Sequence, residues 1–365
     1  MPPFPPSRAD ASNRSTSAVA PAQTQRDARF VVLIPIRDDW ESARLLLDAL
    51  DDALGGAGLT AEVLMVDDGS EQPWTTWDWP TCYNHLERVE VLPLRRNLGH
   101  QRAIALGLAY LEAERDRPAV VVMDGDGEDN PRDVPMLWRR CVDEGMTKIV
   151  FAGRARRSES RVFQVGYRTY QVLHRVLTGI PVRFGNFSVI PPVRLASLTT
   201  VTELWNHYAA AAVRSRQPHV VVPTHRAKRL KGQSRMNFPA LVIHGLSAVS
   251  VFSEIVGVRL LILASLLLGA LSGAALGLGV YVWWTGQVVP KSWIVGIGLI
   301  LGLPAFLALL ALGFCVLVLA SRSSAGFLPC RDYHFFFDPP QPVAPRLTTA
   351  LPAESASIPS SRRAS

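Results

Sequence analysis

Two long apolar stretches near the C-terminal end constrain the fold of this chain more than any other feature. They cover residues 258–284 and 292–320, and Lys291 is the only Lys, Arg, Asp or Glu between Leu260 and Ser321. Each stretch exceeds the roughly 20 residues that a helix needs to cross the hydrocarbon core of a bilayer. A buried core helix is the alternative for one such stretch, but two uncharged stretches in succession favour a transmembrane hairpin.

The charges beside this hairpin predict its orientation. The basic segment 226–259 precedes the first stretch, and Arg322 and Arg331 follow the second. Because Lys and Arg gather on the cytoplasmic side of membrane helices, we expect a multi-pass protein of the cytoplasmic (inner) membrane, with both termini and the preceding domain in the cytoplasm. An aromatic belt at the opposite interface is formed by Trp283, Trp284 and Trp293.

Charge is unevenly distributed along the 365 residues. Residues 1–152 sum to −9 and residues 153–365 to +16, which gives the total of +7. A nucleic-acid binder needs a basic surface over its whole binding domain, so this division argues against one. It favours a cation site in the first part and an anion- or membrane-facing surface in the second. The four cysteines are scattered, which argues against a zinc site and a disulfide framework and fits a reducing compartment.

Composition divides the chain into five parts. Residues 1–28 and 321–365 are rich in Pro, Ser and Ala, so we predict a disordered N-terminal tail and a mostly disordered cytoplasmic C-terminal tail. Residues 29–235 alternate predicted strands and helices and form one predicted domain, which precedes the membrane segments. Residues 236–257 are apolar but interrupted by His and Ser, which predicts an interfacial juxtamembrane helix. The hairpin of two transmembrane helices is the remaining part.

Secondary structure in this predicted domain follows from its hydrophobic pattern. Short β-branched runs predict strands, and apolar residues at helical spacing predict helices between them. The predicted strands cover residues 30–36, 61–66, 89–94 and 119–123, and the helices cover 41–54 and 101–113. This alternation predicts an α/β fold with a doubly wound, parallel sheet. Ligands of such sheets bind beyond the carboxyl ends of the strands.

Two acidic pairs follow predicted strands. Asp67 and Asp68 suit hydrogen bonds to a nucleoside, and a tight turn with an Asp cap is an equal alternative. Asp124 and Asp126 are separated by one glycine, and carboxylates at this spacing can converge on one hard divalent ion that bridges to a diphosphate. An acidic solvated loop is the alternative for the second pair, and the buried strand before it disfavours that alternative.

Two further segments have features of anion sites. Residues 97–101 lead into a helix whose first N–H groups suit an anion, although a helix start without a ligand fits equally well. Four basic residues surround Gly232 and Ser234, and the guanidinium groups of the three arginines suit phosphate oxygens; the four are Arg226, Arg229, Lys231 and Arg235. A positive membrane anchor is the alternative for this segment. The sequence contains no glycine-rich dinucleotide turn after the first strand and no NTP-binding phosphate loop.

The order of these motifs resembles that of the family 2 glycosyltransferases, most closely the branch of dolichol-phosphate mannose synthase and the bacterial polyprenyl-phosphate glycosyltransferases. The resemblance covers about residues 30–320 and includes the terminal hairpin. It implies a GT-A nucleotide-sugar-binding fold and an inverting, metal-dependent hexosyltransferase with Mg²⁺ or Mn²⁺ as cofactor. The implied donor is a UDP- or GDP-linked sugar, and the implied acceptor is a polyprenyl-phosphate lipid. Whether the chain forms homo-oligomers stays open.

The same resemblance implies the roles of individual residues. Those matching the donor-binding positions are Pro35, Asp39, Asp67, Asp68, Asn97 and Ser234. Asp124 and Asp126 match the metal and diphosphate site and are counted among the catalytic residues. Arg229, Ser234 and Arg235 match a segment that closes over the phosphates near the membrane, and the two arginines complete the catalytic set.

The chain departs from the family pattern at four places. Residues 37–39 read Arg-Asp-Asp where the family usually has Tyr-Asn-Glu, and Arg235 stands where it has Lys. Glu128 or Asp129 replaces a Gln. Residues 185–188 read Gly-Asn-Phe-Ser instead of Gly-Asp-Phe-Arg, so that an acid near the acceptor is lost.

Two further hypotheses stay open, and this last departure, together with the unusual stretch at residues 203–208, motivates the first of them. One is transfer to a hydroxyl of a lipid-linked saccharide in exopolysaccharide or cell-envelope assembly. That acceptor needs a carboxylate base, for which Glu203 and Glu128 are the candidates, whereas a lipid phosphate arrives largely ionised and needs none. The other is a non-catalytic membrane scaffold that retains the nucleotide fold.

Overall fold

The described strands form one mixed sheet in the order β7-β5-β6-β4-β1-β2-β3-β8. The computed structural model describes residues 29–154, 161–180, 184–232, 238–288, 290–321 and 326–344. Within them the strands are β1 (Phe30–Ile36), β2 (Ala61–Asp67), β3 (Leu86–Pro93), β4 (Ala119–Val122), β5 (Ile149–Arg154), β6 (Phe184–Ile190), β7 (His219–Thr224) and β8 (Gln341–Ala344). The α/β class predicted from the sequence is confirmed.

Strand direction departs from the predicted parallel sheet at two positions. β1 lies between β2 and β4 and is parallel to both, and β2 is parallel to β3. β6 is antiparallel to both of its neighbours, β4 and β5, and β8 is antiparallel to β3. The sheet is therefore mixed and not wholly parallel, because β6 and β8 run opposite to the strands beside them.

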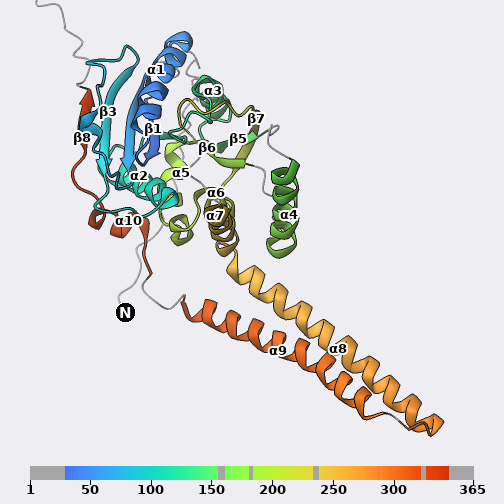
Figure 1. Cartoon of the computed structure of the whole chain (residues 1–365). Helices are drawn as coiled ribbons and strands as arrows, with labels where there is room; N and C mark the ends of the chain where they lie inside the picture. Colours follow the sequence, from blue (N-terminus) through green and yellow to red (C-terminus); the bar gives the residue numbers. More distant parts are fainter. Residues whose placement is uncertain are drawn as a thin grey trace, which may run out of the picture.

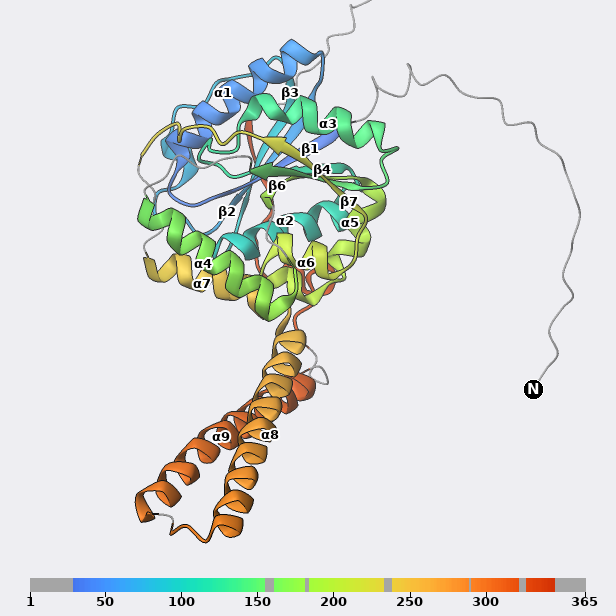
Figure 2. The same ribbon diagram turned by 90° about the vertical axis from the view of Figure 1, so that its right-hand side faces the viewer.

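Helices cover both faces of the sheet (Figure 2). α1 (Trp40–Ala57) and α3 (Val134–Asp143) pack on one face, and α2 (His100–Glu114), α5 (Pro192–Thr199) and α6 (Tyr208–Arg214) pack on the other. Successive side chains of β1 alternate between these two cores. Because both faces are buried, the strand reads as a continuous apolar run instead of an alternating one. Short 3₁₀ turns are η1 (Trp74–Thr76), η2 (Pro131–Asp133) and η3 (Thr202–Trp205).

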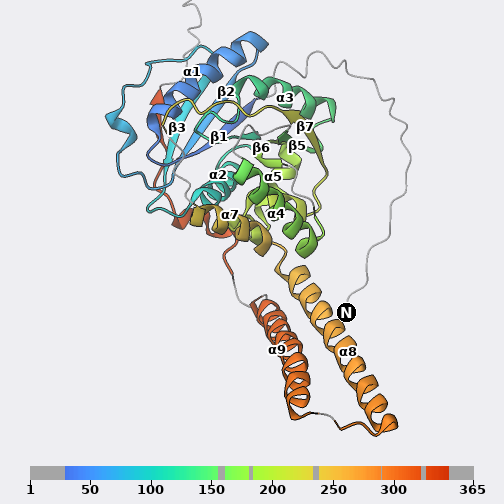
Figure 3. The same ribbon diagram turned by 45° about the vertical axis from the view of Figure 1, so that its right-hand side comes forward.

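A hairpin of two long helices projects from this domain (Figures 1 and 3). α4 (Arg161–Thr178) and α7 (Phe238–Ser250) lie where it begins, α8 (Ser253–Thr285) runs outward, and α9 (Lys291–Ser321) returns. Both long helices are apolar enough to cross a bilayer, and only 17% and 11% of their most apolar stretches are buried. That exposure excludes the alternative of core helices in the described fold.

The chain after the hairpin returns to the α/β domain. α10 (Pro329–Asp332), η4 (Tyr333–Phe335) and β8 lie beside α2 and β3 (Figure 1). The prediction of a mostly disordered tail at 321–365 is therefore wrong for residues 326–344, because aromatic side chains within this segment pack against the domain. The predicted tail at 1–28 lies outside the described residues.

Candidate active site

The turn after β2 places one carboxylate against a loop from the neighbouring strand. Asp68 accepts hydrogen bonds from the N–H groups of Leu98 (2.7 Å) and Gly99 (2.9 Å), and from Asn97 Nδ2 at 3.3 Å. Gly69 has a φ of +67°, and a Cβ at this position would lie 2.6 Å from the backbone nitrogen of Asn97. Only glycine fits both the backbone conformation and the close approach. The 97–99 loop is therefore tied directly to Asp68.

The end of β1 lies beside this turn. Pro35 is buried in register with Val66 of β2. The N–H of Ser70 donates to Asp67 Oδ1 at 2.9 Å, and the Ser70 hydroxyl accepts from the N–H of Asp38 at 2.8 Å. The predicted donor-binding residues on these strands thus lie together at the carboxyl edge of the sheet.

Asp67 and Asp68 are both buried. Burial raises the pKa of Asp67 above its usual value, although its hydrogen bonds to Ser70 act in the opposite direction. Burial likewise raises the pKa of Asp68, and the N–H groups of Leu98 and Gly99 partly compensate. Such desolvated, hydrogen-bonded carboxylates are typical of ligand sites as well as of structural turns.

The second acidic pair follows β4. The N–H of Asp124 donates to Asp129 Oδ2 at 3.0 Å, and Asp126 Oδ1 accepts from the N–H of Glu128 at 3.0 Å. Gly125 packs against β1, where an added Cβ would lie 3.3 Å from the carbonyl oxygen of Pro35. Burial, followed by repulsion from Asp124, raises the pKa of Asp126 to about 6. The loop therefore holds excess negative charge.

This charge fits a divalent cation. Within the described parts of the chain, His, Cys, Asp and Glu form no group of three placed to hold a metal. Mg²⁺ commonly takes one or two protein carboxylates and completes its shell with water and substrate phosphates. Asp124 and Asp126 supply that donor set, and a cation between them would relieve the repulsion that raises the pKa of Asp126.

A basic segment lies over the acidic loop. The N–H of Leu230 donates to the carbonyl of Asp126 at 3.0 Å. Arg229 bridges the two halves of the site, since it bonds Asp39 Oδ2 at 2.9 Å and lies 3.4 Å from Asp126 Oδ2. The predicted residues Ser234 and Arg235 lie outside the described residues. The structure thus brings Arg229 to the predicted acidic residues.

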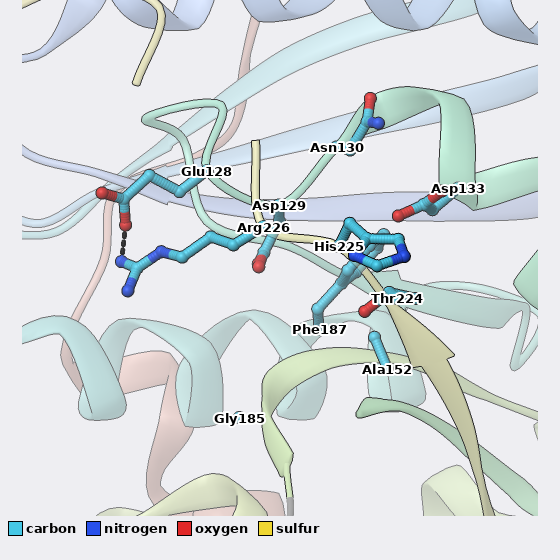
Figure 4. A pocket seen from close by; sticks show the side chains of 10 residues that line it. All are labelled: Glu128, Asp129, Asn130, Asp133, Ala152, Gly185, Phe187, Thr224, His225 and Arg226. Atoms are coloured by element: carbon cyan, nitrogen blue, oxygen red, sulfur yellow. Dashed lines mark ion pairs between the residues drawn. The ribbon is translucent and has the colours of Figure 1, made fainter. Parts of the chain in front are cut away.

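Figure 4 shows a small pocket between the acidic loop and this basic segment. Its lining residues are Glu128, Asp129, Asn130, Asp133, Ala152, Gly185, Phe187, Thr224, His225 and Arg226. The carboxylate of Glu128 points to the guanidinium of Arg226 and forms an ion pair with it (Figure 4). Glu128 is therefore already paired with a cation.

The other candidate base lies in a different cluster. Glu203 accepts a hydrogen bond from Arg214 Nε at 2.8 Å, and Arg214 also donates to Glu254 of α8 at 3.1 Å. This cluster joins η3 and α6 to the start of the hairpin. The geometry gives Glu203 a structural contact there.

A series of polar contacts, to which the sequence motifs assigned no role, leads from α6 to Asp124. The N–H of Tyr208 donates to Gln101 Oε1 at 2.7 Å, so the Gln101 amide nitrogen faces Asn186 Oδ1 at 3.3 Å. The Asn186 amide nitrogen then faces His100 Nε2 at 3.1 Å, and this nitrogen lies 3.1 Å from Asp124 Oδ1. Asn186, which stands where the family usually has an acid, therefore lies beside the histidine that contacts the predicted metal site.

Charge around His100 is dominated by this contact. The surrounding protein partly desolvates this exposed ring and opposes its charged form, but the carboxylates of Asp124, Asp126 and Asp129 outweigh that effect and raise the pKa of His100. The signal in the sequence was a histidine directly after Gly99 at a helix start. Its partner at position 186 is 86 residues away, so the pairing depends on the fold.

A comparison with protein families decides the assignment of this domain. Residues 31–195 match the model described as glycosyl transferase family 2. The chain carries a family 2 glycosyltransferase domain. The resemblance read from the motifs is thereby confirmed, as is the GT-A-like α/β architecture. The matched segment includes both acidic pairs and the 97–99 loop and ends before the basic segment.

Several curated glycosyltransferases are similar to the family 2 domain and its surroundings. An uncharacterised glycosyltransferase of Synechocystis is 26% identical over 229 residues, which are 61% of this chain and 69% of that protein. The undecaprenyl-phosphate 4-deoxy-4-formamido-L-arabinose transferase of Klebsiella pneumoniae strain 342 is 27% identical over 114 residues, or 31% of this chain. This match covers only 33% of the Klebsiella enzyme. The Salmonella paratyphi B enzyme of the same name is 23% identical over 222 residues, which are 58% of this chain and 63% of that enzyme.

Among solved structures, glucosyl-3-phosphoglycerate synthase from Mycobacterium tuberculosis is similar to this chain with a TM-score of 0.44 and 14% identity. The alignment covers 67% of this chain and 86% of that one. That enzyme was solved with Mn²⁺, UDP-glucose and phosphoglyceric acid.

Proposed function

We propose that the protein is a membrane-bound, inverting glycosyltransferase that moves a sugar from a UDP- or GDP-linked donor to a polyprenyl phosphate at the cytoplasmic face of the membrane. The observation that carries this proposal is the bridging of Asp39, which follows β1, and Asp126 of the acidic loop by Arg229, in a domain that carries a hairpin able to span a bilayer. Nucleoside recognition, diphosphate neutralisation and access to a lipid are then combined in one site.

Donor binding is assigned to the carboxyl edge of the sheet. Asp67, Asp68 and Asn97 offer hydrogen-bonding groups beside Pro35 and Asp39, at the place where ligands of open α/β sheets bind. Asp124 and Asp126 would hold Mg²⁺ or Mn²⁺, which when bound neutralises charge on the leaving nucleoside diphosphate. Arg229, and Arg235 beyond the described segment, would add cationic stabilisation as that charge develops.

The contacts of the candidate bases favour a phosphate acceptor over a hydroxyl acceptor. Glu128 is paired with Arg226, and Glu203 is paired with Arg214 away from the acidic loop. A saccharide hydroxyl needs a free carboxylate to take its proton, whereas a phosphate monoester is largely ionised at neutral pH. Attack by a phosphate oxygen on the anomeric carbon from the face opposite the diphosphate gives inversion.

Membrane orientation follows from the same hairpin. Residues 326–344 pack on the domain that precedes α8, so the two ends of the hairpin lie on one side of any bilayer that it spans. The basic residues near both ends favour the cytoplasmic side. Names of the curated relatives support an undecaprenyl-phosphate acceptor, although the match covers only part of those enzymes.

Product analysis tests the proposal. The purified protein is incubated with radiolabelled UDP- and GDP-sugars and with either undecaprenyl phosphate or a lipid-linked saccharide. We expect labelled lipid only with undecaprenyl phosphate, as a product that survives mild base and is cleaved by mild acid. Transfer confined to the saccharide acceptor would contradict the assignment and would favour the hydroxyl reaction.

A further inference from the structure

The segment after the hairpin forms part of the edge of the catalytic domain. We call residues 326–344 the C-terminal strap. Its strand β8 pairs with β3, with Gln341 opposite Val91, and Phe337 bridges to Leu94 just beyond the end of β3. Figure 1 shows the strap running beside β3 and α2 on its way from α9.

Aromatic side chains attach the strap to the domain. The Trp205 ring lies 3.8 Å from the Phe327 ring and 5.3 Å from the Phe336 ring, measured between centroids. Phe337 meets Tyr110 of α2 edge-on at 5.5 Å. Edge and tilted ring pairs of this kind add to the apolar area that they bury. The strap is therefore held to both η3 and α2.

Arg95 connects the strap to the site. Its N–H donates to the carbonyl of Phe336 at 2.9 Å, its Nη1 to the carbonyl of Phe335 at 3.1 Å, and its Nε to Asp338 at 3.1 Å. The N–H of Asp338 donates in turn to the carbonyl of Pro93 at 3.0 Å. Residue 95 stands two positions before the 97–99 loop that binds Asp68.

We propose that the C-terminal strap is a positioning element for the nucleotide-sugar: by fixing residues 94–96, it holds the 97–99 loop against Asp68, in the conformation that presents Asn97 to the nucleoside. The α2 helix fixes the other end of this loop. A loop ordered before the ligand arrives loses less conformational entropy on binding. The membrane hairpin is then an insertion between two parts of one catalytic unit. This inference rests on the proposed function only for the class of its ligand.

Three phenylalanines in sequence allow a matched test in the full-length protein. Phe336→Ala and Phe337→Ala remove rings that attach the strap, whereas Phe335→Ala removes a ring that is 63% exposed. We expect the first two to raise the donor KM and the dissociation constant of UDP or GDP by about tenfold, with kcat within about twofold. Phe335→Ala should match the wild type, and Phe337→Tyr should restore affinity.

Truncation provides a second measurement. A chain ending at Ser321 lacks the strap and should lose nucleotide affinity, whereas one ending at Ala344 retains it and should bind normally. Unchanged affinity in Phe336→Ala and Phe337→Ala, or equal loss in Phe335→Ala, would overturn the role of the strap. Wild-type protein that binds neither UDP nor GDP would overturn the proposed function instead, so the two failures are distinguishable.

Discussion

Gly69 is the residue at which backbone conformation and site geometry depend on each other most closely. Gly69→Ala would place a methyl group 2.6 Å from the backbone nitrogen of Asn97, so the 97–99 loop must move away from Asp68. We expect donor affinity measured by calorimetry with UDP or GDP to fall by about tenfold or more.

Gly58→Ala is the matched control for this change. Gly58 has a φ of +65°, close to that of Gly69, but no atom within 4 Å of the added Cβ. Both variants carry the strain of a left-handed alanine, about 1–2 kcal/mol. If Gly58→Ala lowered nucleotide affinity as much as Gly69→Ala, general destabilisation would explain the effect and the link between the loop and Asp68 would be excluded.

Asn186 is expected to affect turnover more than donor binding. Asn186→Ala removes the amide beside the His100 ring, and this ring contacts Asp124. Loss of a group that orients a metal ligand typically costs about 10–100-fold in metal affinity or activity. We therefore expect kcat to fall by about tenfold and Mn²⁺ affinity, followed by EPR of the free ion, to weaken.

Ser188→Ala provides the comparison on the same strand. Ser188 is buried and bonds Tyr208 at 2.6 Å, so its loss costs about 1–3 kcal/mol of stability. Within the described residues Ser188 forms no hydrogen bond with His100, and kcat should change little. Equal losses of kcat in both variants would mean that Asn186 acts only through packing.

Individual site residues were predictable where a short motif carried them. Asp67, Asp68, Asp124 and Asp126 each follow a strand whose apolar run is visible in the sequence, and the fold brings these strands to one edge. Asn186 and His100 belong to no common motif, and their contact depends on β6 lying beside β4. The ion pairs of Glu128 and Glu203 could not be predicted from the sequence either, because each partner arginine lies on another part of the fold.

At the scale of elements, a buried histidine, His207, caps the N-terminus of α6. His207 accepts a hydrogen bond from the N–H of Ala210 at 3.4 Å, and its ring lies 4.8 Å from that of His244 on α7. Burial, together with repulsion from His244, His100 and His174, lowers the pKa of His207 to about 3. The folded protein thus favours the neutral ring.

The lowered pKa of His207 predicts that the folded protein loses stability in acid. An unfolded histidine titrates near pH 6.5, so the contribution of His207 to stability is fully present above that pH and is lost as the pH falls below it, on the order of 2 kcal/mol by about pH 5. His207→Asn keeps a capping oxygen without a titrating ring. The variant should show a smaller drop in melting temperature between neutral pH and about pH 5, and an unchanged drop would contradict the shift.

Elements with strong local patterns were predictable, and those that depend on distant partners were not. The predicted hairpin at 258–284 and 292–320 corresponds to α8 and α9, since long apolar runs need no tertiary context. The sequence predicted neither β6 nor β8, nor their antiparallel direction. β8 contains two of the Pro and Ala residues that suggested a disordered tail, and its pairing is set by the neighbouring strap contacts.

At the scale of the whole molecule, the hairpin should place its loop on the opposite side of the membrane from the domain. Val288 in this loop is 93% exposed, and the native Cys82 on the domain is also exposed. In intact cells, a membrane-impermeant maleimide should label Val288→Cys, whereas Cys82 should react only after permeabilisation. Labelling of Cys82 in intact cells would reverse the proposed orientation, and labelling of both sites only after permeabilisation would exclude the crossing.

The central claim is that the acidic loop of this membrane-anchored domain catalyses sugar transfer to a lipid phosphate. The most direct test compares wild-type protein with Asp124→Asn combined with Asp126→Asn, both reconstituted in vesicles that contain undecaprenyl phosphate and supplied with labelled UDP- and GDP-sugars. We predict acid-labile labelled lipid from the wild type and none from the double variant, with equal insertion of both into the membrane. Sugar transfer by the double variant would contradict the catalytic role of the acidic loop. A wild-type protein that transfers no sugar, in cells whose phenotype the double substitution leaves unchanged, would favour a non-catalytic scaffold.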